Sequence, residues 1–387
     1  MSTILDTLRR DLPEFTAIRR DIHAHPELGL QEHRTAALVA ERLEAWGIEV
    51  HRGVGGTGVV GVLRAGDLGR NDAPRIGLRA DMDALPMQEE NGFAHASRSP
   101  GRMHACGHDG HTTMLLAAAK YLAETRRFEG TVHFIFQPAE EGDGGADAML
   151  ADGLFERFPC DTVFGLHNRP GLAVGQYGIR PGPAMAGVVF WDIKVQGKGG
   201  HGARPEATFD PVVAGSAIVQ ALQSVVSRNV AAADRAVLST TRFDAGQAYN
   251  VIPDSVRLGG TVRAFSNDVL RLVEDRMRGI AEGVAAGFGC SATLDFRVVT
   301  TPLVNDAAQV TAMAEAAEAL GPVDRDFPAV MGGEDFAAML ERVPGAYILV
   351  GNGDSAEVHH PRFDFNDATI PYGAGALAAL VEAKLAR

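Results

Sequence analysis

The segment TVHFIFQPAEEG, residues 131–142, is the strongest indication of the fold class, because its apolar strand pattern leads directly into acidic residues. A helical pattern of apolar residues precedes it at residues 112–124, and a second strand pattern follows at residues 162–166. Strands that alternate with helices in this way favour a mainly parallel sheet with helices on both faces. Functional groups in such sheets gather at the carboxyl ends of the strands. The sequence therefore predicts an α/β fold with a site just beyond residue 137.

The same alternation extends toward both ends of the chain. On the N-terminal side we expect a helix at residues 34–46 and strands at 48–51, 59–63 and 76–80. On the C-terminal side we expect a helix at residues 307–320, a strand at 346–350 and a closing helix at 372–385.

A different pattern begins near Gly182. We expect strands at residues 188–195, 237–243, 255–263 and 291–299, and helices at residues 210–228 and 268–286. The resulting order βαββαβ is that of a ferredoxin-like unit of about 115 residues. Because the α/β alternation resumes afterwards, we predict an inserted domain at residues 184–299 within a catalytic domain formed by residues 1–183 and 300–387.

Composition restricts the class of protein. The 387 residues carry 36 basic and 49 acidic side chains, and this excess of acid argues against nucleic acid as the partner. Three cysteines are too few and too scattered for a disulfide framework, which favours a reduced, cytoplasmic protein. Residues 1–20 lack the apolar core of a signal peptide, and no apolar run reaches the roughly 18 residues of a membrane span.

The segment MHACGHDGH, residues 103–111, brings together one cysteine, three histidines and an aspartate. Cys106 and His108 can face the same metal ion if the backbone turns between them, and Gly107 permits such a turn. The alternative is a loop with incidental histidines.

Glu140 and Glu141 follow the strand at residues 131–137. Adjacent carboxylates point in different directions on an extended chain, so one can bind a metal while the other reaches a bound water. That division of roles suits a metal-dependent hydrolase. The alternative is a solvated acidic loop.

Three further groups follow predicted strands of the same sheet. His167 follows residues 162–166, and the pair His359 and His360 comes after residues 346–350. A lone histidine is more often structural than metal-ligating, but several candidate groups at the ends of strands favour a shared site for two ions. Asp81 and Asp83 follow residues 76–80, where one or both could orient a metal-binding histidine. The alternative for Asp81 is a turn at the end of the strand.

One motif in the sequence is misleading. Residues 53–58 satisfy the G-x-G-x-x-G pattern of dinucleotide sites, but a strand pattern follows at residues 59–63 where that fingerprint requires a helix. We therefore predict a glycine-rich hairpin. The sequence also lacks a G-x-S-x-G elbow and a C-x-x-C pair, so a serine hydrolase and a structural zinc site find no support.

In this order the clusters resemble the metallopeptidase family of aminoacylases, dinuclear-zinc carboxypeptidases and succinyl-diaminopimelate desuccinylase. The resemblance is closest to its amidohydrolase branch of hippurate hydrolases, indole-acetyl-amino-acid hydrolases and N-acyl-diaminopimelate deacetylases. It covers nearly the whole chain. The matching stretches are residues 20–27, 78–86, 103–111, 137–141, 197–202, 250–253, 332–336 and 359–361.

The resemblance implies two divalent metal ions, Mn²⁺ or Zn²⁺ with Co²⁺ or Ni²⁺ as further options. The implied ligands are Cys106, His108, Glu141, His167 and His359. His359 is preferred over His360 because the family places its ligand two residues before a proline. Asp81 stands where many relatives outside this branch carry a histidine. The implied catalytic residues are Glu140 as general base, His201 and Asp83.

The inserted segment corresponds to the lid of the family, which commonly also forms a homodimer. By this resemblance His201 would reach the active site of the neighbouring subunit and stabilise the oxyanion, and Asn250 would assist it. Arg263 is a candidate for binding the substrate carboxylate, because a guanidinium fork suits a carboxylate. A surface salt bridge of Arg263 is the alternative.

The function that follows from the resemblance is hydrolysis of N-acyl amino acids to a carboxylic acid and a free amino acid. Glu140 would take a proton from a water that bridges the two ions, and the resulting hydroxide would attack the amide carbonyl. One alternative is an aminopeptidase, dipeptidase or carboxypeptidase activity on the same dinuclear scaffold. Another is a binding protein that keeps the fold without catalysis, but all candidate residues are present.

Overall fold

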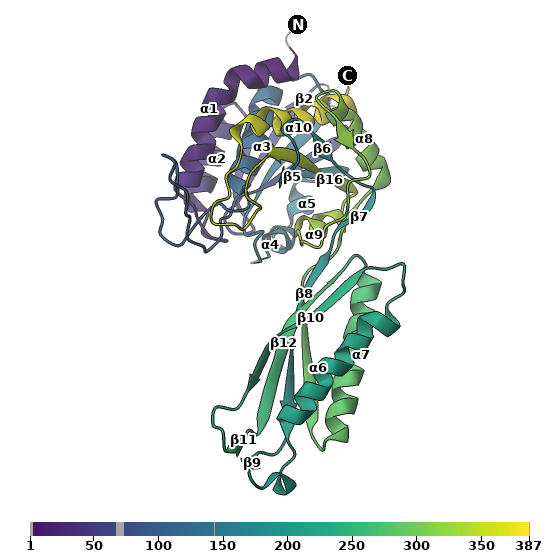
Figure 1. The fold of residues 1–387 in the computed structure, drawn as a ribbon. Coiled ribbons are helices and arrows are strands. Elements are labelled where there is room, and N and C mark those ends of the chain that lie inside the picture. Colours follow the sequence, from purple (N-terminus) through teal and green to yellow (C-terminus); the bar gives the residue numbers. More distant parts are fainter. Residues whose placement is uncertain (1–2, 67–72, 143, 387) are drawn as a thin grey trace. The chain divides into compact units, whose positions relative to one another are not determined.

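The structure is a computed structural model that describes residues 3–66, 73–142 and 144–386. The chain forms two compact units (Figure 1). The first comprises Met1–Gly182, Val304–Pro328 and Asp335–Arg387, and the second comprises Pro183–Leu303 and Ala329–Glu334. The boundaries expected from the sequence, with an inserted domain at residues 184–299, remain a prediction.

An eight-stranded sheet organises the first unit, in the order β1-β2-β4-β3-β5-β16-β6-β15. Its four central strands, β4, β3, β5 and β16, are parallel to one another, as predicted, whereas β2 and β6 on either side of them pair antiparallel. The strands are β1 (Glu49–Val54), β2 (Gly58–Ala65), β3 (Arg75–Asp81), β4 (Gly130–Gln137), β5 (Thr162–Pro170), β6 (Tyr177–Gly178), β15 (Val323–Asp324) and β16 (Gly345–Gly353). Strands β1 and β2 pair as an antiparallel hairpin, as predicted, with residues 55–57 as its turn.

Helices cover both faces of this sheet. Alternate strand residues such as Leu78 and Phe164 join the main core with the helices α1 (Ile4–Ala24), α2 (His33–Ala45), α3 (His108–Thr125), α8 (Ala307–Glu318) and α10 (Ile370–Lys384). The intervening residues Arg79 and Tyr347 face the other way and contact Phe336 of α9 (Phe336–Leu340). That second face also carries α4 (Gly145–Ala151), which packs against α5 (Leu154–Arg157) and α9.

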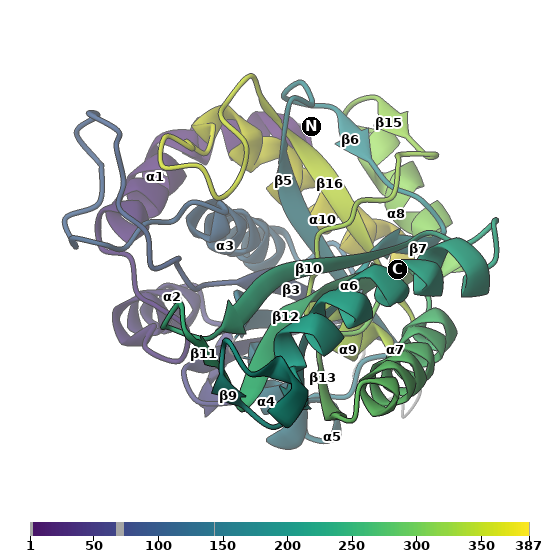
Figure 2. The same cartoon turned by 60° about the horizontal axis from the view of Figure 1, so that its bottom comes forward.

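The second unit is a four-stranded antiparallel sheet with two helices on one face (Figure 2). Its chain order is β8 (Gly187–Gln196), α6 (Pro211–Asn229), β10 (Ala236–Ala245), β12 (Ser255–Ala264), α7 (Asn267–Gly287) and β13 (Ser291–Thr300). The sheet order β10-β12-β8-β13 gives the ferredoxin-like arrangement that the sequence predicted. Helices α6 and α7 lie side by side over a separate core around Trp191.

Short elements complete the chain. Strands β9 (Gly200–His201) and β11 (Val251–Ile252) pair with each other, as do β7 (Gly182–Met185) and β14 (Leu303–Asn305). Two 3₁₀ turns lie at Pro205–Ala207 and Asp367–Thr369.

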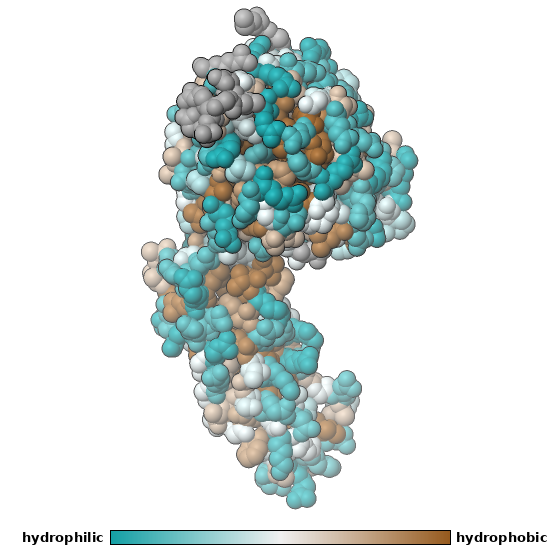
Figure 3. All heavy atoms as spheres, turned by 180° about the vertical axis from the view of Figure 1, so that it is seen from behind, coloured by the Kyte–Doolittle hydropathy of each residue, from teal (hydrophilic) through white to brown (hydrophobic). Residues whose placement is uncertain are grey.

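The surface of the second unit exposes large apolar side chains, including Phe190, Phe209, Phe243, Tyr249 and Val251. On the face seen in Figure 3, hydrophobic residues gather in patches on this unit. Among the helices of the described residues, none combines the length and the apolar character needed to cross a membrane.

Candidate metal centre

The predicted metal ligands come from segments at the carboxyl ends of the parallel strands in the first unit. Glu140 and Glu141 follow β4, and His359 lies in the loop after β16. Cys106 and His108 stand at the start of α3, which packs against β3. The sequence placed His167 just after its strand, but β5 continues through His167 to Pro170.

Two overlapping groups of side chains form the cluster. Cys106 lies with His108 and His167 in one group, and with Glu141 and His359 in the other, with potential ligand atoms within 4.8 Å of one another in each group. The Cys106 Sγ lies 3.3 Å from His167 Nε2, and His359 Nε2 lies 3.2 Å from Glu141 Oε1. The structure therefore brings all five predicted ligands together, with the cysteine common to both groups.

The surroundings of the two His108 ring nitrogens show whether the cluster fits a metal ion. Its Nδ1 lies 3.1 Å from Asp83 Oδ1, and its Nε2 is buried 3.9 Å from carboxylate oxygens of both Glu140 and Glu141. Within the described residues this Nε2 makes no hydrogen bond. A histidine that donates one ring N–H to a carboxylate presents its other nitrogen as a ligand. Thiolate, imidazole and carboxylate together suit Zn²⁺ and related divalent ions.

The pKa shifts of the clustered side chains also favour a bound metal ion. Burial raises the pKa of the Cys106 thiol well above its usual range, and the nearby charge of Glu141 adds to that effect. Burial alone would lower the pKa of His108, but Asp81 and Cys106 outweigh it and raise that pKa well above the ordinary value. Burial and the neighbouring His111 lower the pKa of His167 well below its usual range. A divalent cation would compensate the negative charge gathered here.

The two aspartates after β3 have different contacts. Asp83 contacts His108 with one oxygen and accepts the backbone N–H of Glu141 with the other, at 2.9 Å. Asp81 instead accepts hydrogen bonds from His111 Nδ1 and Arg79 Nη1, each at 2.7 Å. Asp81 is therefore held by two side-chain donors, and its contacts support the residues next to the proposed ligands.

This supporting network includes residues that sequence reasoning missed. Arg79 is fully buried in β3, where it also donates to Gln137 and pairs with Asp335. Asn168, next to His167, contacts His111 Nε2 through its side chain and its backbone N–H. The available signal was an arginine in the middle of an apolar strand, because such a charge needs buried partners.

Of the two adjacent histidines after β16, the structure places His359 at the cluster. Its backbone has the left-handed φ of 63° and its N–H bonds to the carbonyl of Ala105. Both histidines are exposed, but His359 Nε2 lies beside Glu141, whereas His360 Nδ1 accepts the backbone N–H of Arg362.

The residues predicted to contact substrate lie in the second unit. His201 pairs with Val251 across β9 and β11, and the neighbouring Gly202 donates to the carbonyl of Asn250. Both His201 and Asn250 are exposed. Arg263 of β12 donates to Thr261 and lies over the ring of Phe190, and it forms no ion pair within the described part of the chain.

Comparison with known proteins gives the family. The model of peptidase family M20/M25/M40 matches residues 77–383. The chain belongs to this family. It is 43% identical to a hippurate hydrolase of Campylobacter jejuni over 95% of both chains, and 41% identical to an N-acetylcysteine deacetylase of Bacillus subtilis over 91% of this chain and 92% of the relative. A solved Bacillus subtilis structure, described as a dinuclear metal-binding peptidase of the M20 family, superposes with a TM-score of 0.86 at 36% identity, covering 97% of this chain and 99% of its own.

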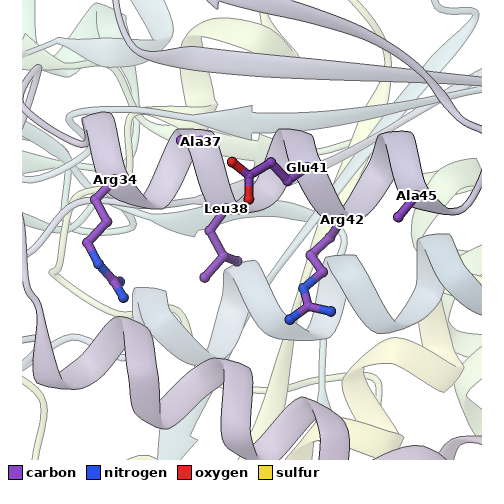
Figure 4. A pocket seen from close by; sticks show the side chains of 6 residues that line it. All are labelled: Arg34, Ala37, Leu38, Glu41, Arg42 and Ala45. Carbon is purple, nitrogen blue, oxygen red and sulfur yellow. The ribbon is translucent and has the colours of Figure 1, made fainter.

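A hollow elsewhere on this M20-family chain carries no comparable chemistry. It has a volume of about 450 Å³ and lies along α2, lined by Arg34, Ala37, Leu38, Glu41, Arg42 and Ala45 (Figure 4). Its two arginines already pair with carboxylates of α1, Arg34 with Asp21 and Arg42 with Glu14. None of the predicted site residues lines it.

Proposed function

We propose that the protein is a metal-dependent amidohydrolase that cleaves N-acyl amino acids into a carboxylic acid and a free amino acid. The observation that carries this proposal is the buried His108 Nε2, which faces Glu140 and Glu141 inside a group of thiol, imidazole and carboxylate ligands. Two relatives at about 40% identity are named for N-acylated amino acids, hippurate and N-acetylcysteine, which supports this substrate class.

The five clustered residues would hold two divalent ions, with Cys106 between the two groups. When bound, such ions polarise the amide carbonyl and lower the pKa of a coordinated water. We expect Mn²⁺ or Zn²⁺, with Co²⁺ or Ni²⁺ as further options, because a thiolate favours the softer divalent ions.

Glu140 is the proposed general base. Its carboxylate lies beside the ligand group without belonging to either set that contains Cys106. It would accept a proton from the attacking water and deliver it to the amine that leaves. Asp83 would hold the ring of His108 and the backbone of Glu141 in place during both steps.

The second unit would complete the site from a partner chain. The proposed role of the exposed His201 is a hydrogen bond to the oxyanion, with Asn250 assisting and Arg263 binding the substrate carboxylate. The exposed apolar side chains of this unit support a homodimer formed through it. We further expect a cytoplasmic protein, because all three cysteines are free.

A substrate panel on chelated protein tests this proposal. It contains benzoylglycine, N-acetyl amino acids, indole-acetyl conjugates and the matching free dipeptides, each with added Mn²⁺, Zn²⁺ or Co²⁺. Metal-dependent release of amino acid from the acylated compounds supports the proposal. Release from free dipeptides alone would point to a peptidase. Metal-loaded Glu140→Gln protein serves as the control, and full turnover by this variant would exclude Glu140 as the base.

A further inference from the structure

A buried carboxylate outside the metal cluster has unusual partners. Glu32, just before α2, has an exposed fraction of 0%, and no Lys, Arg or His among the described residues forms an ion pair with it. Its Oε1 accepts the backbone N–H of Ala139 at 2.8 Å, and its Oε2 accepts the hydroxyl of Thr57. Burying an unpaired carboxylate is costly, so these two hydrogen bonds must hold it in place.

The residue that Glu32 holds has a strained backbone. Ala139 has a φ of 53°, in the left-handed region that residues with a Cβ rarely adopt. Such a conformation is strained for an L-residue, so the surrounding structure must impose it. On its carbonyl side Ala139 accepts the N–H of Gly145 at 3.0 Å. Gly145 packs so closely that an added Cβ would lie 1.6 Å from the carbonyl oxygen of Pro138.

Ala139 directly precedes Glu140, so its backbone angles set the direction of the Glu140 side chain. On the far side of Glu140, the N–H of Glu141 is fixed by Asp83 at 2.9 Å. Glu140 is therefore bracketed by two carboxylates that each accept one backbone N–H, Glu32 at Ala139 and Asp83 at Glu141.

The other contact of Glu32 explains the glycine-rich hairpin. Thr57 lies in the turn between β1 and β2, and Gly55 of the same turn donates its N–H to Asp152. An added Cβ at Gly55 would lie 2.6 Å from the backbone of Met149 in α4. These contacts fix the turn in the position where the Thr57 hydroxyl donates to Glu32.

We infer that Glu32 is a positioning residue for Glu140, holding Ala139 in its left-handed conformation through a chain of contacts from Thr57. This inference rests on the proposed role of Glu140 as general base. It requires the Glu32 carboxylate to act through the backbone, because it bonds to the Ala139 N–H and the Thr57 hydroxyl and belongs to none of the candidate ligand groups of the described residues.

The test compares Glu32→Ala, Glu32→Gln, Ala139→Gly and the double variant Glu32→Ala/Ala139→Gly, each loaded with Mn²⁺ or Zn²⁺ and assayed on the best N-acyl amino acid of the panel. Glu32→Ala should lower kcat about tenfold to a hundredfold with little change in KM, because misplacement of a general base affects the chemical step. Glu32→Gln keeps an acceptor for Ala139 and should retain most of kcat. Glycine favours positive φ, so Ala139→Gly should restore part of the loss.

Amide hydrogen exchange provides a readout besides activity. The Ala139 N–H should exchange faster in Glu32→Ala than in the wild type, while the α3 and α10 amides stay protected. Asn305→Ala is the matched control, because Asn305 is another buried side chain that bonds to backbone groups, those of Tyr347 and Arg180. This control should lower the melting temperature and leave kcat unchanged.

Three results would each overturn the inference. The first is an unchanged kcat in metal-loaded Glu32→Ala, and the second is a loss of kcat in Glu32→Gln or Asn305→Ala as large as that in Glu32→Ala. The third is a double variant whose change in log kcat equals the sum of the two separate changes of Glu32→Ala and Ala139→Gly. If Glu32→Ala does not fold, Thr57→Val decides: slower turnover with faster Ala139 exchange supports the inference, and no change in either refutes it. A fully active Glu140→Gln would instead refute the proposed function itself.

Discussion

The carboxylate of Asp83 lies 3.1 Å from Nδ1 of His108, and this contact leaves the opposite ring nitrogen facing Glu140 and Glu141. The second oxygen of Asp83 holds the backbone N–H of Glu141. One buried side chain therefore fixes two of the five proposed ligands at once, and it links the loop after β3 to the turn after β4.

Removing that carboxylate should weaken metal binding. In Asp83→Asn the charge that orients His108 is lost, and losses of such supporting groups lower metal affinity by about 10–100-fold. Competition of the protein with a chromophoric chelator for Zn²⁺ measures this. Asp161→Asn is the control, because Asp161 is an exposed carboxylate paired with Arg75. Equal affinity of Asp83→Asn and wild type would contradict the role of Asp83.

Cys106 should be the cysteine whose reactivity depends on metal. Metal loading should protect it from alkylation, and Cys106→Ser should bind less Zn²⁺ because a hydroxyl is a poorer ligand than a thiolate. Elemental analysis and mass spectrometry of alkylated peptides measure both effects. Cys160→Ser should keep full metal content, since Cys160 contacts His133 and lies outside the cluster. If Cys106→Ser keeps as much metal as Cys160→Ser, Cys106 is not a ligand.

His201 should act on the metal centre of a partner chain. If so, inactive His201→Ala and inactive Glu140→Gln subunits, mixed and allowed to exchange, should regain activity that neither parent has. One site in each mixed dimer then combines an intact Glu140 with an intact His201 from the other subunit. Activity is assayed after exchange and compared with each variant alone. Mixed dimers without activity would show that His201 does not act across the interface.

The stability of the first unit should fall at alkaline pH because of His23. Burial alone would lower the pKa of His23, but the carboxylates of Asp109 and Glu89 outweigh burial and raise it to about 9. A folded-state pKa above the unfolded value gives stability that is complete below about pH 6.5 and lost as pH rises through about 9, up to about 3 kcal/mol. The other ionisable groups near His23 are Arg19, His95, His104 and Asp364.

Urea unfolding of the wild type and His23→Gln at pH 6, 7.5 and 9 measures this effect. The free energy of unfolding should decline between pH 6 and 9 in the wild type, and the decline should be smaller in the variant. Parallel pH curves for the two proteins would show that His23 does not carry the effect.

Most strands and helices follow from the sequence, because apolar periodicity and flanking glycines mark them. Helix α1 did not emerge, since charged residues interrupt its apolar stripe and Pro13 lies inside it. Helix α3 begins at His108, four residues before the predicted start, because Gly107 adopts a φ of 97° and turns the chain directly into the helix. Local pattern alone does not reveal how far a helix extends into a polar motif.

Glu141, His167 and His359 were predictable because they lie at the ends of strands, and Cys106 and His108 because they stand together in a short polar motif. All five also match a family pattern. Their supports were not, because Arg79, Asn168 and Glu32 act through contacts between distant segments. Glu32 bonds to Ala139 across 107 residues, and His111 meets Asn168 across 57. No local pattern encodes such pairs, so they emerge only once the sheet is assembled.

The most direct test of the central claim is a metal titration of hydrolysis. Chelated protein receives Mn²⁺ or Zn²⁺ in steps, while metal content and amino-acid release from an N-acyl amino acid are followed together. We predict that activity rises with metal and saturates at about two ions per chain, as a dinuclear hydrolase requires. A chain that binds no metal, or binds two ions and releases no amino acid from any acylated substrate, would contradict the account.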